Sequence, residues 1–161
     1  MRKIIFIGLA LTFFLGLNVY GLNNSFLDIH NKIFEESQEI KLLLPNSKDI
    51  VLLSSMWDTC LLTISQLDAY FHMLGIFNTI NEKNLNQEAV AELTQWLSEI
   101  KRGSELNLKI LNESARPTEA STKNHIEKIK SHFSELNKRI DAELGKVSIL
   151  DKSIKRKKKS Q

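Results

Sequence analysis

Four side chains of the metal-ligand type come together if the helices predicted below fold back on one another. Asp68 and His72 are four residues apart and therefore share one face of a helix. A chain reversal near residue 83 places Glu99 level with Asp68, and a reversal near residue 115 places His132 level with Glu99. Zinc accepts carboxylate and imidazole ligands, so this set is a candidate metal site. Each residue lies one step off an apolar stripe, where we expect solvated charge pairing, with the metal site as the alternative.

A second polar group interrupts the apolar face of the helix predicted for 84–112. Ser104 and Asn107 occupy positions where apolar residues are expected, and His125 lies level with them after the next reversal. Such a layer can line a ligand cavity between helices. We expect instead that it marks a wet end of a bundle or fixes the register of its helices, with the cavity as the alternative.

A run of five cations follows the last apolar pattern. Its members are Lys155, Arg156, Lys157, Lys158 and Lys159. We expect residues 155–161 to be disordered and solubilising, with contact to an anionic surface as the alternative function. Without this run and the two cations at Arg2 and Lys3, fifteen basic and nineteen acidic side chains remain, a net charge of −4. The sequence therefore predicts a mildly acidic domain that carries a basic tail.

Sequence motifs for catalysis are missing. The 161 residues contain no Gly-rich phosphate loop, no nucleophile elbow and no Cys-rich metal motif. A Cys-x-x-Cys-His haem attachment and the Glu-x-x-His pairs of di-iron bundles are also absent. We therefore expect a protein that is not an enzyme and that needs no cofactor.

The stretch from Ile50 to Leu74 organises the fold. Its apolar residues recur in steps of three and four, which on a helix form one stripe. They are Ile50, Leu53, Trp57, Cys60, Ile64, Leu67, Phe71 and Leu74. The stripe predicts a helix over 47–81 that is buried along one side. Because Cys60 lies within it and has no second cysteine to pair with, we expect a buried, unreactive thiol.

Three further apolar patterns predict helices over 26–44, from Asn84 or Asn86 to 112, and from Thr118 or Ser121 to 154. Pro45 and Pro117 lie between patterns, as proline does at helix boundaries. Long, unequal helices with short polar connections indicate an all-α, antiparallel (up-down-up-down) four-helix bundle over residues 25–154. The alternative is an extended body of three helices, with helix 26–44 packed on only part of it.

The first residues have the composition of an export signal. Arg2 and Lys3 precede an apolar stretch, and Val19-Tyr20-Gly21 suits a cleavage site, so residues 1–21 are predicted to be a signal peptide. The alternative is an uncleaved membrane anchor over residues 4–22. In both cases the body lies outside the cytoplasm, in the periplasm or the extracellular space.

These observations favour an exported helical bundle that works by binding. The expected partner is another protein or an anionic surface of the cell envelope rather than nucleic acid, and exposed helix faces could also join copies of the chain. The alternative is a periplasmic-type domain of four helices that binds a small ligand or a metal through one of the polar groups above.

Overall fold

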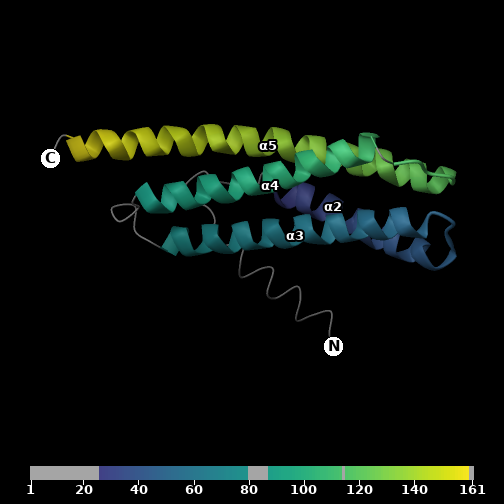
Figure 1. Ribbon diagram of the computed structural model, residues 1–161. Coiled ribbons are helices and arrows are strands. Elements are labelled where there is room, and N and C mark those ends of the chain that lie inside the picture. The colour runs from purple at the N-terminus through teal and green to yellow at the C-terminus, as the bar shows by residue number, and fades with distance from the viewer. Residues whose placement is uncertain (1–25, 80–86, 114, 160–161) are drawn as a thin grey trace, which may run out of the picture.

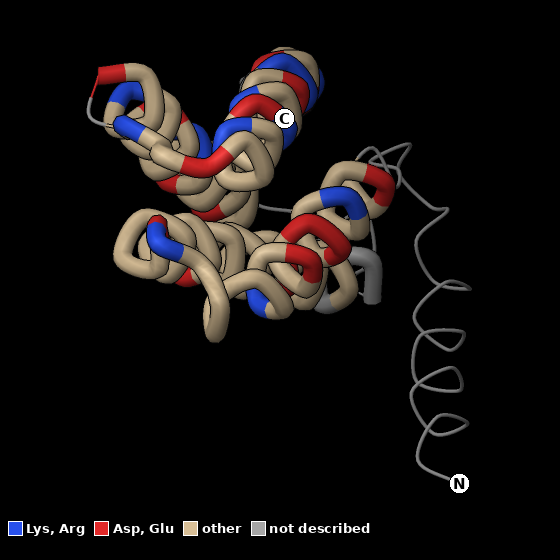
Figure 2. Tube along the Cα trace, turned by 90° about the vertical axis from the view of Figure 1, so that its right-hand side faces the viewer, with Lys and Arg blue, Asp and Glu red and all other residues tan. Residues whose placement is uncertain are grey.

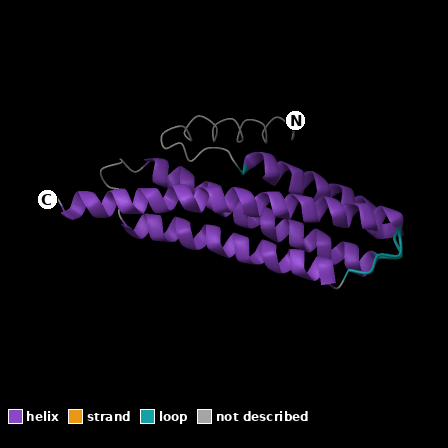
Figure 3. Cartoon of the chain, turned by 90° about the horizontal axis from the view of Figure 1, so that it is seen from above, coloured by secondary structure: helices purple, strands orange, loops and turns teal. Residues whose placement is uncertain are grey.

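The computed structural model describes residues 26–79, 87–113 and 115–159, and this part of the chain is almost entirely helical (Figures 1 and 3). In chain order its elements are α2 (Leu27–Leu43), the 3₁₀ turn η1 (Leu44–Asn46), α3 (Ile50–Thr79), α4 (Gln87–Glu113) and α5 (Ala120–Lys159). No strand occurs among the described residues. The predicted all-α class is therefore confirmed. The predicted signal peptide and anchor, and the predicted helix starts at Asn84 and Asn86, lie outside the described residues.

The helix boundaries follow the signals in the sequence closely. Pro45 lies within η1, where α2 has ended, and Pro117 lies between α4 and α5. At the start of α3, the Asp49 amide donates a hydrogen bond to Ser47 Oγ (3.0 Å), and the Asp49 carbonyl accepts from the Leu53 amide (2.9 Å). Ser47 thus supports the first turn of α3, as serine does at helix N-termini.

The four helices form a bundle in which each packs against its neighbours in the chain and α2 also packs against α5. The helices differ in length, from 17 residues in α2 to 40 in α5. Figures 1 and 3 show that α2 lies along one half of the bundle only, and that the end of α5 projects beyond the other helices. The bundle therefore has four helices at the η1 end and three at the other, which combines features of both predicted architectures.

The buried line of α3 is rotated from the predicted stripe. The α3 side chains that are buried are Leu53, Met56, Cys60, Thr63, Ile64, Leu67, Tyr70 and Leu74. Ile50 is instead 49% exposed, and Trp57 and Phe71 are half-buried. These two aromatic residues lie at the edge of the core, where the Lys41 ammonium lies 5.7 Å from the Trp57 ring and the His30 ring packs near Phe71. Neighbouring apolar residues such as Met56 and Trp57 allow either line, and packing selects the one that faces the other helices.

Cys60 is buried, as the sequence predicted. Burial, with a smaller contribution from the nearby Glu36 charge, raises the pKa of its thiol to about 12. Because the thiolate is the reactive form, this cysteine is chemically inert at neutral pH.

The basic run differs from its prediction. Helix α5 continues to Lys159, so the backbone of residues 155–159 is helical rather than disordered. Lysine and arginine are good helix formers, and cations near a helix C-terminus interact favourably with the helix dipole. Residues 160–161 lie outside the described part.

Two leucines of α3 provide a matched test of this core. Leu67 is fully buried, whereas Leu62 is 59% exposed. We expect Leu67→Ala to lower the free energy of unfolding by about 2–5 kcal/mol, because it leaves a cavity among packed side chains. Leu62→Ala should change it by no more than about 0.5 kcal/mol. Urea unfolding followed by circular dichroism measures both, and equal losses would contradict the observed face of α3.

Candidate functional site

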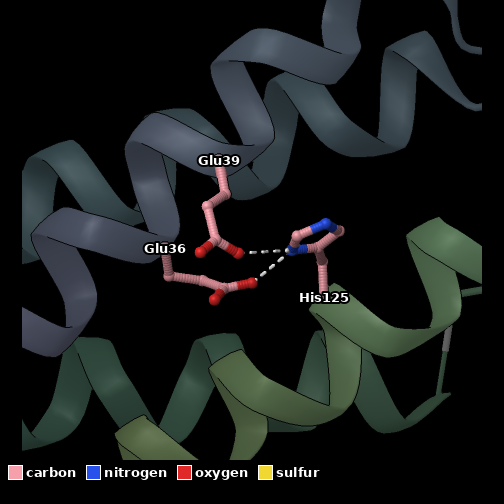
Figure 4. Close-up of side chains that lie close together, drawn as sticks. All are labelled: Glu36, Glu39 and His125. Atoms are coloured by element: carbon pink, nitrogen blue, oxygen red, sulfur yellow. Dashed lines mark hydrogen bonds and ion pairs between the residues drawn. The ribbon is translucent and has the colours of Figure 1, made fainter.

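A polar cluster lies within the interface between α2 and α5. Glu36 and Glu39 come from α2, and His125 and Lys128 come from α5. Each pair is three residues apart, so its two side chains lie on the same face of their helix. Figure 4 shows the two carboxylates of α2 and the imidazole of α5 pointing toward one another. We call these four residues the Glu36 cluster.

Its contacts link every member to another. The Glu36 carboxylate forms a short contact with His125 Nδ1, and Glu39 Oε2 lies 4.0 Å from the same nitrogen. Lys128 Nζ lies 3.2 Å from Glu36 Oε2 and 2.7 Å from Glu39 Oε2. The ammonium group of Lys128 therefore bridges the two carboxylates. The imidazole of His125, the second α5 residue of the cluster, also faces both of them.

Burial makes these contacts necessary. Glu36 is only 3% exposed, and a buried carboxylate is costly unless it is paired with a cation or hydrogen-bonded. Glu39, in contrast, has a side chain that is 53% exposed. The hydrogen bond that Lys128 donates to Glu39, together with the charge of Lys128, lowers the pKa of Glu39, and the same hydrogen bond raises the pKa of Lys128.

Three members of the cluster have the arrangement of a metal site. One ligand atom from each of Glu36, Glu39 and His125 lies within 4.8 Å of the other two. Among the described residues, no other group of three carboxylate, thiol or imidazole side chains has its ligand atoms this close together. Two carboxylates and one imidazole are a donor set that zinc uses.

The metal ligands predicted from the sequence are not assembled. Asp68 pairs across the α2–α3 interface with His30, with 3.0 Å between Oδ1 and Nε2, and Glu99 pairs with Arg102 on its own helix (2.8 Å). His132 is half-buried on α5, where burial lowers its pKa, and His72 is exposed on α3. Asp68 and Glu99 therefore form charge pairs, as expected, and the alternative metal site is not assembled because Asp68 faces α2 rather than α4.

The predicted polar layer is divided between two interfaces. Ser104 is buried, and its hydroxyl donates to the Phe133 carbonyl (3.4 Å), whereas His125 faces α2 in the Glu36 cluster. Asn107 lies at a cavity of about 100 Å³, which neither Ser104 nor His125 lines. The residues that line the cavity are Leu52, Ser55, Met56, Thr59, Asn107, Ile110, Leu111, Ala115 and Ile129.

A shallow groove on the outer side of α3 adjoins this cavity and shares Ser55, Thr59 and Asn107 with it. We call it the α3 groove, and its lining residues are Ile50, Val51, Ser54, Ser55, Asp58, Thr59, Leu62 and Asn107. Val51 is 82% exposed, and Ile50 and Leu62 are about half exposed. Apolar side chains are thus open to solvent beside serine, threonine and aspartate.

The composition of α3 explains this groove. Asp58 and Asp68 are the only Asp, Glu, Lys or Arg residues in α3, whereas Figure 2 shows such residues spread over the other helices. Within α3, Ile50–Gly75 is long and apolar enough to cross a membrane, by length and composition alone. It has a mean hydropathy of 1.4, and 33% of it is buried in the bundle. Core helices of soluble proteins meet the same criterion, but here much of the apolar surface remains uncovered.

Asp49 connects the segment between η1 and α3 with the segment that leads into α5, at the η1 end of the bundle. Its carboxylate accepts hydrogen bonds from the Thr118 amide (3.0 Å), the Glu119 amide (2.9 Å) and the Thr118 hydroxyl (2.6 Å). Nearby, the Ser47 hydroxyl donates to the Glu119 carboxylate. Asp49 therefore lies at the start of α3 and at the same time holds the chain that leads into α5.

The Glu36 cluster was missed from the sequence, although one signal for it was present. Glu36 lies three residues after Ile33 and four before Ile40, on the face that is buried in α2. A carboxylate at such a position requires a partner from another helix. The sequence gives no means to choose His125 and Lys128 as that partner, because the choice depends on which face of α5 meets α2.

The comparisons with known proteins found no match: no protein-family model, no curated protein and no solved structure matches this chain.

The Asp49 contacts predict a specific dependence of stability on pH. The Thr118 hydroxyl, followed by the Glu119 and Thr118 amides, lowers the pKa of Asp49 from 3.8 to about 2. Because the folded-state pKa is lowered, this stabilisation is present above pH 3.8 and is lost as the pH falls toward about 2. Asp49→Asn should therefore lose stability at neutral pH and show a weaker further loss across that window.

Urea unfolding at a series of pH values measures this difference. Asp58→Asn is the matched control, because Asp58 is exposed on the same helix. Parallel pH profiles for the wild type and Asp49→Asn would show that Asp49 does not carry the predicted stabilisation.

Proposed function

We propose that the protein is exported and acts without catalysis, by binding another macromolecule through the α3 groove. The observation that carries this proposal is the exposure of apolar side chains on α3, with Val51 82% and Leu62 59% exposed. Monomeric proteins rarely leave extended apolar surface uncovered, and such patches mark interaction sites. An apolar centre with a polar rim, here Ser54, Asp58 and Asn107, is the usual composition of a protein interface.

The partner that fits this surface is a protein that presents apolar side chains, such as one face of an amphipathic helix. A second copy of this chain satisfies the same requirement through its own α3 groove. The proposal also includes a contact between the basic run at 155–159 and an anionic surface of the cell envelope, with no role for nucleic acid. The net charge of −4 for the body favours a role in which only this end meets an anionic surface.

The proposal includes the antiparallel order of the four helices. Three pairs between α2 and α5 support it for these two helices, because residue numbers fall along one helix as they rise along the other. They are Asp28–Arg139, Lys32–Glu135 and Glu39–Lys128. Short connections between successive helices extend the same order to the whole bundle.

Export is proposed from the sequence of residues 1–21. When the full chain is expressed in its host, we expect the mature protein to begin at Leu22 and to fractionate outside the cytoplasm. Intact-mass measurement and N-terminal sequencing distinguish this from an uncleaved anchor over residues 4–22, which gives an unprocessed N-terminus in the membrane fraction. Full-length protein in the cytoplasmic fraction would contradict both forms of the proposal.

Cross-linking from the α3 groove tests the binding function. Because Cys60 is buried and its pKa is raised to about 12, a cysteine introduced by Val51→Cys is selectively modified by a maleimide photocross-linker. We expect one discrete cross-linked species in the cell fraction that holds the protein in its host. Adding Leu62→Asp should remove this species, because a charge buried in the contact opposes apolar association. A size increase to twice the chain mass identifies the second copy as the partner.

The matched control carries the same probe on an exposed position of α5, introduced by Lys138→Cys. Identical products from both positions, or no product from Val51→Cys, would refute the assigned surface. Circular dichroism must show that Leu62→Asp leaves the helical content unchanged.

The second candidate function is a small-ligand or metal-binding domain. The cavity at Asn107 has about 100 Å³, well below the roughly 300–1,000 Å³ of pockets for organic ligands. The Glu36 cluster, in contrast, offers three metal-ligand side chains in one place. The metal-binding form is therefore the one that the geometry favours.

A further inference from the structure

We propose that Glu36, Glu39 and His125 bind a zinc ion, and that Lys128 neutralises the two carboxylates when the metal is absent. This inference deepens the second candidate function and uses none of the residues of the α3 groove. A failure of zinc binding therefore leaves the cross-linking test of the groove unaffected, and the reverse also holds.

The distances in the cluster are compatible with coordination after a small movement. Zinc lies about 2.0–2.2 Å from oxygen and nitrogen ligands, so tetrahedral ligands are roughly 3.3 Å from one another. The Glu36 oxygen and His125 Nδ1 are already in contact, and Glu39 Oε2 lies 4.0 Å from Nδ1. Glu39 must approach, which its exposed side chain can do by rotation, and Glu36 and His125 Nδ1 must separate slightly and give up their mutual contact to admit the ion. Water from the exposed side completes the coordination.

Charge balance explains how the site remains stable without metal. Lys128 Nζ contacts both carboxylates, and its side chain is 39% exposed, so it can leave the cluster toward solvent. A divalent cation then replaces the positive charge of the ammonium. Glu36, which is buried, therefore has a cationic partner both without and with the metal and is never left as an isolated buried charge.

The neighbouring charges leave Lys128 as the principal competitor. Lys32 and Glu135, which also influence this part of the α2–α5 interface, pair with each other (3.2 Å).

The donor set favours zinc over the alkaline-earth cations. Calcium requires six to eight oxygen ligands, and magnesium prefers octahedral oxygen coordination. One imidazole nitrogen with two carboxylates suits zinc better. Calcium is consequently a negative control in the same experiment.

Isothermal titration of the protein obtained from the full chain, with ZnCl₂ and separately with CaCl₂ at pH 7.5, tests the inference. We expect one zinc per chain and no calcium binding. Glu39→Gln and His125→Gln should each weaken zinc binding by more than the roughly 10–100-fold that loss of an outer-shell partner costs, because each removes a direct ligand. Lys128→Met should strengthen it, because the competing ammonium is removed. A role of these residues in folding alone would not produce opposite effects on zinc affinity.

Matched controls come from the same helices. Glu35→Gln on α2 and Lys130→Met on α5 alter the same residue types outside the cluster, and neither should change zinc affinity. Glu39 is exposed, so Glu39→Gln tests the site even if His125→Gln unfolds, which circular dichroism detects. The inference is overturned if neither the wild type nor Lys128→Met binds zinc, or if Glu39→Gln binds it as tightly as the wild type.

Discussion

A line of side chains along α3, from Leu53 to Leu74, is removed from water because α2 and α4 pack against this helix. With Cys60 as the one cysteine, no intramolecular disulfide can take the place of this burial. Each fully buried apolar side chain contributes about 1.5–3 kcal/mol, opposed by the entropy of ordering the chain. Directly before α2, the Phe26 ring lies edge-on against Tyr70 of α3, with 5.6 Å between centroids, and adds an aromatic contact to this core.

Polar contacts accompany apolar burial where α2 packs on α5. The buried carboxylate of Glu36 requires a partner, which Lys128 supplies as a cation and His125 as a contact through Nδ1. The Asp28–Arg139 pair (2.7 Å) continues the same alignment toward the start of α2.

The helices could be predicted from the sequence, and their contacts could not. Apolar spacing and the two prolines, Pro45 and Pro117, are local signals, so the helix boundaries agree with the structure within a few residues. The choice between Met56 and Trp57 for the core depends on the neighbouring helices, because both residues are apolar and adjacent in the chain. The candidate site was harder still. Its residues come from α2 and α5, and a sequence alone does not state which faces of two distant helices meet.

The link between Asp49 and the chain before α5 has a consequence for the kinetics of folding. Asp49 and Thr118 are 69 residues apart in the chain, so their hydrogen bonds close a long loop. Contacts between segments so far apart are expected to form late in folding, after α3, α4 and the start of α5 are in place. Interactions absent from the transition state act mainly on the unfolding rate. We therefore expect the Asp49 contacts to slow unfolding and so to prolong the lifetime of the folded bundle.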